Sequence, residues 1–180
     1  MPELQRLTAD HAAAVLAFER TNRAYFAASI SDRGDEFFDQ FVERHSARLA
    51  EQDAGIGAFH VLVTEDGSVL GRFNLIFLQD GVAELGYRVA QDVAGRGVAT
   101  SAVRELCRVA AARYSLHTLR AATSRENAAS RKVLTNAGFV PAGPADPADL
   151  GGKEGTWYTR DLTATDRATA DPSTGAVTGL

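Results

Sequence analysis

The sequence has little of what disulfide-bonded, membrane-spanning or zinc-binding proteins depend on. It contains one cysteine, one methionine and one tryptophan in 180 residues. Cys107 cannot form a disulfide within the chain and lacks neighbours at zinc-ligand spacing, so we expect no metal and a reducing compartment, the cytoplasm. No stretch approaches the roughly 18 consecutive apolar residues of a membrane span, and residues 1–6 lack the order of a signal peptide.

Positive charge is also in short supply. The 19 Lys and Arg residues are outnumbered by 23 Asp and Glu residues, which gives a formal net charge of −4. A basic field over the whole surface, of the kind that attracts nucleic acid or an anionic membrane, is therefore excluded. We expect neither as a partner, and any polyanion has to bind at a local site.

What the sequence does contain is the pattern of one α/β domain. Its 45% hydrophobic and 23% charged residues are typical of a soluble domain with a single core. Apolar spacing predicts strands at 3–7, 59–64, 69–78, 82–89, 118–123, from 139 and at 155–162, and helices at about 10–21, 35–51, 98–114 and 127–136. Asp66-Gly67 and Asp80-Gly81 between apolar runs predict antiparallel hairpins, and hence a mixed, mostly antiparallel sheet flanked by helices.

Three segments lack such periodicity. Residues 21–34 mix loop-forming residues with aromatics, which suits an exposed binding rim. Residues 141–152 are rich in Pro, Ala, Gly and Asp, and we expect a mobile loop there. Residues 163–180 contain no aromatic and few large apolar side chains, so we expect a disordered tail after a domain spanning 1–162.

A strand, a glycine turn and a helix start follow one another between Glu84 and Thr100. This order places free backbone N–H groups and the positive end of a helix dipole at one point, an arrangement that binds phosphate. A P-loop is excluded because no lysine precedes Arg131. A Rossmann fingerprint fits poorly because Thr100 stands where its third glycine belongs. A tight turn without a ligand is the alternative.

Two blocks resemble the GCN5-related N-acetyltransferase (GNAT) superfamily. The block Ala94-Gly95-Arg96-Gly97-Val98-Ala99 resembles its acetyl-CoA motif, although Ala94 replaces the usual Gln or Arg. Asn127-Ala128-Ala129-Ser130, followed by Gly138-Phe139, resembles the signature of the RimJ/RimL-like branch, which acetylates ribosomal proteins. The resemblance covers residues 4–162 and implies a GNAT fold, in which splayed central strands form the acetyl-CoA cleft.

The resemblance also implies how acetyl-CoA, the co-substrate, is bound. Asn127 would hydrogen-bond the pantetheine arm, Arg131 would lie near the phosphates, and a backbone N–H near Val89 would polarise the acetyl carbonyl. The pyrophosphate would rest on the segment formed by Gly95, Arg96, Gly97, Val98, Ala99 and Thr100. No metal is implied.

Two residues are candidates for proton transfer. Many GNAT enzymes carry a Tyr seven residues after the Asn, but position 134 is Leu, so Ser130 is the candidate acid or thiolate stabiliser. Glu84 is the candidate base for the attacking amine. The alternatives are a polar residue in a first helical turn and a solvated, outward-facing Glu. Neutralising a lysine amine at pH 7 costs about 4 to 5 kcal/mol and an α-amine about 1 kcal/mol, so a single Glu suits an α-amine better.

The acceptor is less clearly indicated. Arg72 and Asn74 share one face of their strand and could line an acceptor pocket, while Tyr25 and Phe26 could form its rim, although a solvated sheet face and core packing are alternatives. We expect direct acetyl transfer in a ternary complex to a primary amine, with a protein N-terminal α-amine implied by the RimJ/RimL-like block. A small-molecule amine acetyltransferase and a non-catalytic acetyl-CoA-binding module are the other two hypotheses. A homodimer is compatible with the sequence, although no residue requires it.

Overall fold

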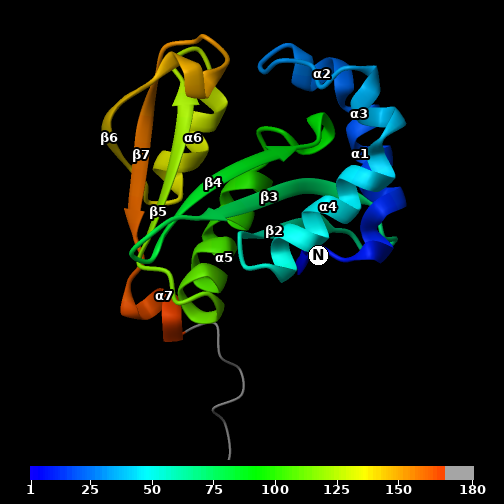
Figure 1. Cartoon of the computed structure of the whole chain (residues 1–180). Coiled ribbons are helices and arrows are strands. Elements are labelled where there is room, and N and C mark those ends of the chain that lie inside the picture. The colour runs from blue at the N-terminus through cyan, green and yellow to red at the C-terminus, as the bar shows by residue number, and fades with distance from the viewer. Residues whose placement is uncertain (169–180) are drawn as a thin grey trace, which may run out of the picture.

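The computed structural model describes residues 1–168, which form one seven-stranded sheet with helices on both faces (Figure 1). The strand order is β1-β2-β3-β4-β5-β7-β6, and every neighbouring pair is antiparallel except β4 and β5. The strands are β1 Glu3–Arg6, β2 Gly57–Val63, β3 Val69–Phe77, β4 Val82–Val89, β5 Thr118–Ser124, β6 Val140–Ala145 and β7 Gly155–Asp161. The predicted mixed, mostly antiparallel sheet is confirmed.

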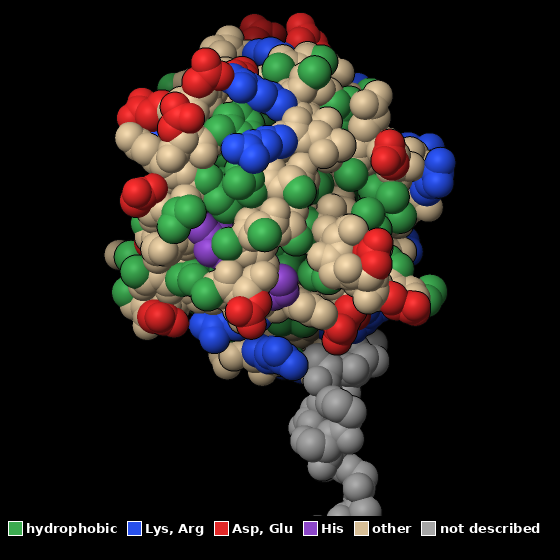
Figure 2. Space-filling view, turned by 90° about the vertical axis from the view of Figure 1, so that its right-hand side faces the viewer, with side chains coloured by type: hydrophobic (Ala, Val, Ile, Leu, Met, Phe, Trp, Pro, Cys, Tyr) green, Lys and Arg blue, Asp and Glu red, His purple; other side chains and the backbone are tan. Residues whose placement is uncertain are grey.

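Helices divide between the two faces of the sheet. One face carries α1 Ala12–Thr21, α2 Arg23–Ala27, α3 Asp35–Asp39 and α4 Phe41–Asp53, and Figure 2 looks onto the side of the molecule where these helices lie. The other face carries α5 Val98–Arg113 and α6 Ala128–Asn136, with α7 Ala164–Ala168 against α5. No helix among residues 1–168 is long and apolar enough to cross a membrane.

Strand alternation assigns side chains to two apolar clusters, one on each face. Phe73 and Leu75 of β3 pack with Leu106 of α5, and all three are fully buried. Phe59 of β2 packs with Phe41 of α4 on the opposite face. Because side chains of a strand point alternately to the two faces, Arg72 and Asn74, which alternate with Phe73 and Leu75, belong to the α1–α4 face.

The sheet opens between β4 and β5. Their parallel pairing runs only from Val82 opposite Thr118 to Glu84 opposite Arg120. The N–H of Ala90 bonds to Leu70 O of β3 at 2.8 Å, and backbone groups along a strand point to alternate sides. The N–H groups of Tyr87 and Val89 therefore point away from β3, into the gap where β5 has diverged. The splayed central strands expected from the GNAT resemblance are confirmed.

Two helix predictions need correction. Residues 23–27 of the expected rim loop form α2, and the helix expected at 35–51 is interrupted at Gln40, whose φ of −102° and ψ of 21° lie outside helical geometry. The apolar period continues across this break, with Phe37 and Phe41 rings 5.9 Å apart, so periodicity could not reveal it.

The expectations of a mobile loop at 141–152 and a disordered tail from 163 were partly wrong. Within 141–152, residues up to Ala145 form β6, an edge strand with a register shift between Pro141 and Gly143. An edge strand tolerates prolines because their missing N–H is not needed for pairing. Residues 164–168 form α7, and Thr163 and Asp166 cap it reciprocally, each side chain accepting from the other's backbone N–H. The rest of the expected tail, 169–180, lies outside the described residues.

Candidate functional site

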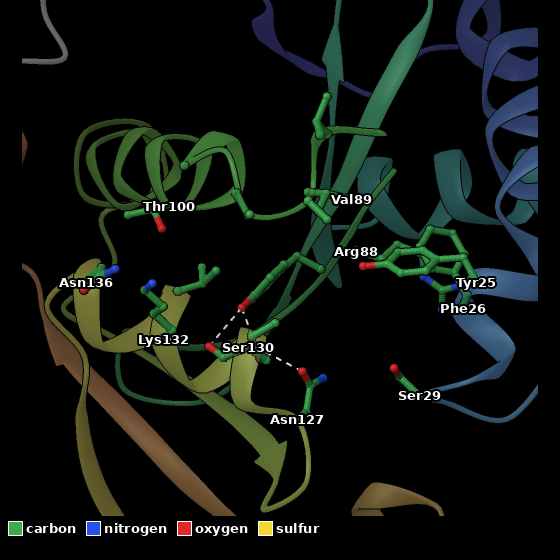
Figure 3. Close-up of a pocket in the computed structure, with 18 of the residues that line it drawn as sticks. Tyr25, Phe26, Ser29, Arg88, Val89, Thr100, Asn127, Ser130, Lys132 and Asn136 are labelled. Atoms are coloured by element: carbon green, nitrogen blue, oxygen red, sulfur yellow. Dashed lines mark hydrogen bonds between the residues drawn. The ribbon is translucent and has the colours of Figure 1, made fainter. Parts of the chain in front are cut away.

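A pocket of about 470 Å³ lies where β4 separates from β5 (Figure 3). Its walls come from β4 and the loop after it, from the first turn of α5, from α6 along its whole length, and from α2 and the residues after it. Its lining includes Tyr25, Phe26, Ser29, Tyr87, Arg88, Val89, Gly95, Gly97, Ala99, Thr100, Asn127, Ser130, Lys132 and Asn136. Residues expected to bind a cofactor and residues expected at an acceptor rim thus share one cavity.

The glycine turn before α5 exposes backbone donors to this pocket. Gly95 and Gly97 have φ of 74° and 78°, in the left-handed region, and no other atom lies within 4 Å of a Cβ added at either. The first bond within α5 runs from Ser101 N to Gly97 O, so the preceding N–H groups of the helix have no helical acceptor. Gly95, Gly97, Ala99 and Thr100 line the pocket, whereas Arg96 and Val98 do not, so the donors that this turn offers a phosphate are mainly backbone N–H groups of the lining residues.

Asn127, the residue before α6, and Lys132 of α6 both line the same cavity. The Asn127 Oδ1 caps the helix by accepting from Ser130 N at 3.1 Å, which leaves its amide N–H donors for a ligand. Lys132 lines the pocket, whereas the exposed Arg131 does not. Lys132 is therefore the α6 cation placed to meet a phosphate, a position that the sequence analysis had given to Arg131.

We expect Asn127→Asp and Asn127→Ala to separate capping from ligand binding. Aspartate keeps the capping oxygen but has no N–H donor, so acetyl-CoA affinity should fall about 10-fold with stability nearly unchanged. Alanine should lose the same affinity and about 1 kcal/mol of stability. Calorimetric titration and urea unfolding of both variants measure the two effects, and unchanged affinity in Asn127→Asp would remove Asn127 from the ligand site.

Tyr87 lines the pocket although it is not among the site residues predicted from the sequence. Its ring stacks on Phe73 with centroids 5.9 Å apart, while its hydroxyl lies 3.1 Å from Ser130 Oγ in the pocket. Burial raises the pKa of Tyr87, so the phenol stays protonated at neutral pH. Leu134, where many GNAT enzymes carry a tyrosine, is fully buried. A phenolic donor thus reaches Ser130 from β4 rather than from α6.

The aromatic rim is held against β4 by a buried ion cluster. Arg88 stacks over Phe26 at 4.9 Å and pairs with Glu19 at 3.3 Å, and Glu19 is only 2% exposed. Arg72 pairs with the same carboxylate at 2.7 Å. Asn22, at the α1–α2 junction, accepts from Gln91 N at 2.9 Å and so ties the rim to the loop after β4. Neither Arg72 nor Asn74 lines the main pocket; both line a second one.

Glu84 lies at the edge of the site rather than in it. It is the last β4 residue paired with β5, is about two-fifths exposed, and bonds Arg120 at 3.2 Å. It does not line the main pocket. Its carboxylate can therefore reach a ligand in the gap only at the gap's closed end or through water.

The described residues contain no cluster of metal ligands, and their one cysteine is buried. No group of three or more His, Cys, Asp or Glu side chains in residues 1–168 is placed to hold a metal ion. Cys107 is fully buried, and burial raises the pKa of its thiol to about 11. A thiol so buried and so weakly acidic does not act as a nucleophile.

The sequence itself matches a known family over most of its length. The model of the acetyltransferase (GNAT) domain matches residues 3–140. The chain belongs to the GNAT acetyltransferase family. The gap between β4 and β5 and the glycine turn before α5 are therefore parts of a GNAT domain. An uncharacterized N-acetyltransferase, p20 of Bacillus licheniformis, is 32% identical over 87 residues, covering 47% of this chain and 49% of p20, so the match spans about half the length of that relative.

Solved structures share this GNAT fold over nearly the whole chain. The ribosomal-protein-S5-alanine acetyltransferase of Vibrio fischeri superimposes with a TM-score of 0.82 at 19% identity, covering 91% of this chain and 94% of that protein. RimJ of Mycobacterium smegmatis, in complex with a CoA disulfide, gives a TM-score of 0.78 at 22% identity, covering 93% and 87%. At these identities the likeness establishes the fold.

Proposed function

We propose that this protein transfers an acetyl group from acetyl-CoA to the α-amine of a protein or peptide N-terminus. One observation carries the proposal: a single pocket joins the free N–H groups before α5 to the unpaired N–H of Val89 and to the Tyr87–Ser130 hydroxyl pair. A phosphate site, a carbonyl-polarising donor and a proton donor are what a thioester of a phosphorylated carrier requires.

The residues present fit acetyl-CoA. The pyrophosphate meets the backbone of Gly95 to Thr100 with the Lys132 ammonium nearby. The amides of the pantetheine arm hydrogen-bond the Asn127 side chain. The apolar stretches of the pantetheine arm contact Val93 and Val133. The acetyl group then lies in the gap beside Val89, between the cofactor side and the Tyr25–Phe26 rim.

Acetyl transfer requires a donor to the carbonyl oxygen, a proton for the leaving thiolate and a base for the amine. The amine attacks the thioester carbon, forming a C–N bond, while the Val89 N–H stabilises the charge developing on the carbonyl oxygen. The C–S bond breaks, and the leaving thiolate receives a proton through the Tyr87–Ser130 pair. Before the attack, the acceptor ammonium loses one proton to Glu84, directly or through water, because only the neutral amine has the lone pair that forms the C–N bond. The second proton, which the nitrogen loses as the amide forms, passes through water and restores the Tyr87–Ser130 pair. Because Cys107 is buried, transfer is direct, within one ternary complex.

A single carboxylate that is about two-fifths exposed suits an acceptor of low pKa. Glu84 pairs with the Arg120 guanidinium at 3.2 Å, and no second carboxylate bonds Arg120 among the described residues. An α-amine, with a pKa near 8, needs far less help than a lysine, with a pKa near 10.4. The Vibrio fischeri protein of the same fold supports this choice, since it is named for acetylating an alanine of ribosomal protein S5.

A thiol-release assay with acetyl-CoA tests the proposal. Peptides with a free N-terminus and blocked lysines should release CoA, and the same peptides with a blocked N-terminus should not. Glu84→Gln should lower the rate more at pH 7 than at pH 9, where the α-amine is already neutral. Release of CoA with polyamines or aminoglycosides alone would show that the acceptor is a small-molecule amine. Binding of acetyl-CoA without any release of CoA would support a non-catalytic binding module.

A further inference from the structure

A second pocket, of about 180 Å³, lies on the α1–α4 face of the sheet. Arg33, Arg44, Arg48 and Arg72 line it together with Asn74 and the rings of Phe37 and Phe41. Asn74 pairs directly with Gly86 of β4, and no other atom lies within 4 Å of a Cβ added at Gly86. The pocket is thus one strand away from the part of β4 that borders the acetyl-transfer gap.

This arginine pocket carries more positive than negative charge. Arg48 pairs with Glu51 at 2.9 Å, while Arg33 and Arg72 share Glu19 with Arg88. Within residues 1–168, the Arg44 side chain forms no ion pair or hydrogen bond. Four guanidinium groups therefore share two carboxylates and the fifth, Arg44, has none, in a chain whose formal net charge is −4.

Aromatic rings hold these guanidinium groups in place. Arg33 stacks over Phe37 at 4.6 Å, and Arg44 approaches the same ring at 5.7 Å. Arg48 stacks over Phe59 at 5.1 Å. Burial, together with repulsion from Arg88, Arg72 and Arg48, lowers the pKa of Arg33 to about 10, so the group is still charged at pH 7. A bound anion would relieve this repulsion without reordering the side chains.

We propose that the arginine pocket binds an acidic side chain of the acceptor peptide, two to four residues after the amine that is acetylated. The inference rests on the proposed acetyl transfer to a peptide N-terminus. Neighbouring strands lie about 4.8 Å apart and an extended peptide advances about 3.3 Å per residue, so a chain crossing from the gap over Gly86 and Asn74 reaches the pocket within a few residues. The planar guanidinium fork matches the geometry of a carboxylate.

Arg44→Gln is the variant that tests the pocket without dismantling the fold. Arg33 and Arg72 bond the buried Glu19 and so carry a structural role, whereas Arg44 bonds no other described side chain. Arg113→Gln, on α5 at the opposite face of the sheet, removes the same charge elsewhere and is the matched control.

The kinetic readout is the ratio of kcat/KM between paired acceptor peptides. The peptides carry Asp or Glu, or their amides Asn and Gln, at positions two to four. The wild-type protein should prefer the acidic peptide about 10-fold at low salt, and Arg44→Gln should lose most of this preference. Arg113→Gln should keep it. Equal kcat/KM for the two wild-type substrates would overturn the proposal while leaving acetyl transfer intact.

A binding measurement separates failure of the pocket from failure of the proposed function. A fluorescent acidic peptide with a blocked N-terminus cannot be acetylated, but it should bind wild type about 10-fold more tightly than its amide counterpart, and Arg44→Gln should abolish the difference. Equal binding of the two peptides overturns the pocket proposal whatever the acetylation assay shows. Competition by inorganic phosphate or free glutamate at the peptide's own affinity would also overturn it, because the pocket would then serve a small anion.

Discussion

Replacing Tyr87 with Phe should lower kcat about 100-fold while acetyl-CoA binds with nearly unchanged affinity. The Tyr87 hydroxyl lies 3.1 Å from Ser130 Oγ, and the two are the hydroxyl donors at the thioester end of the pocket. Phenylalanine keeps the ring that stacks on Phe73, so packing survives and the proton donor alone is lost. Stopped-flow or steady-state kinetics with the best N-terminal peptide measures the effect.

Ser130→Ala and the double variant show whether the two hydroxyls act as a unit. If the proton passes through both, the double variant should be little slower than Tyr87→Phe alone. Tyr114→Phe is the control, since the Tyr114 hydroxyl lies 3.1 Å from His60 Nε2 outside the pocket. Because burial raises the pKa of Tyr87, any alkaline loss of activity caused by this group should occur at a higher pH than for a solvent-exposed tyrosine. A Tyr87→Phe enzyme with unchanged kcat would refute the role.

Glu19→Gln should cost about 3 to 5 kcal/mol of stability, the largest effect we expect from a single charge. Glu19 is 2% exposed and pairs with Arg72 at 2.7 Å, Arg88 at 3.3 Å and Arg33 at 3.7 Å. Glutamine keeps the shape but leaves the buried Arg72 and its neighbours without a counter-charge. The free energy of unfolding, measured in urea, gives the difference directly.

Glu36→Gln is the matched control for Glu19. Glu36 is exposed and bonds only the side chain of Gln40 among the described residues, so its replacement should change stability by less than about 0.5 kcal/mol. A loss of less than about 1 kcal/mol in Glu19→Gln would contradict the account of the cluster. In that case the arginines would be solvated well enough to need no buried partner.

The fold and the glycine turn before α5 could be predicted because their causes are local in the sequence. Asp66-Gly67 and Asp80-Gly81 set the hairpins β2–β3 and β3–β4. Gly95 and Gly97, just before a predicted helix, favour left-handed backbone conformations. The structure shows this conformation at both positions. Such signals need no knowledge of what packs against them.

The Tyr87–Ser130 hydroxyl pair and the arginine pocket could not be predicted because they arise from tertiary contacts. Alternation along β4 predicts that the Tyr87 side chain points inward. It does not predict that the Tyr87 hydroxyl lies within hydrogen-bond distance of Ser130 on α6. Likewise, Arg33, Arg44 and Arg72 are separated by up to 39 positions in the chain and meet only because α4 packs against β2, the strand beside β3. A sequence pattern reports which face a side chain takes, and not its partner across the fold.

Amide ¹H–¹⁵N spectra recorded during titration with acetyl-CoA test the central claim most directly, namely that the gap between β4 and β5 and the turn before α5 form one binding site. The account predicts the largest shifts at Val89, Gly95, Gly97–Thr100 and Asn127–Ser130, with little change on α4. Shifts confined to another face of the sheet, or none at saturating acetyl-CoA, would contradict it.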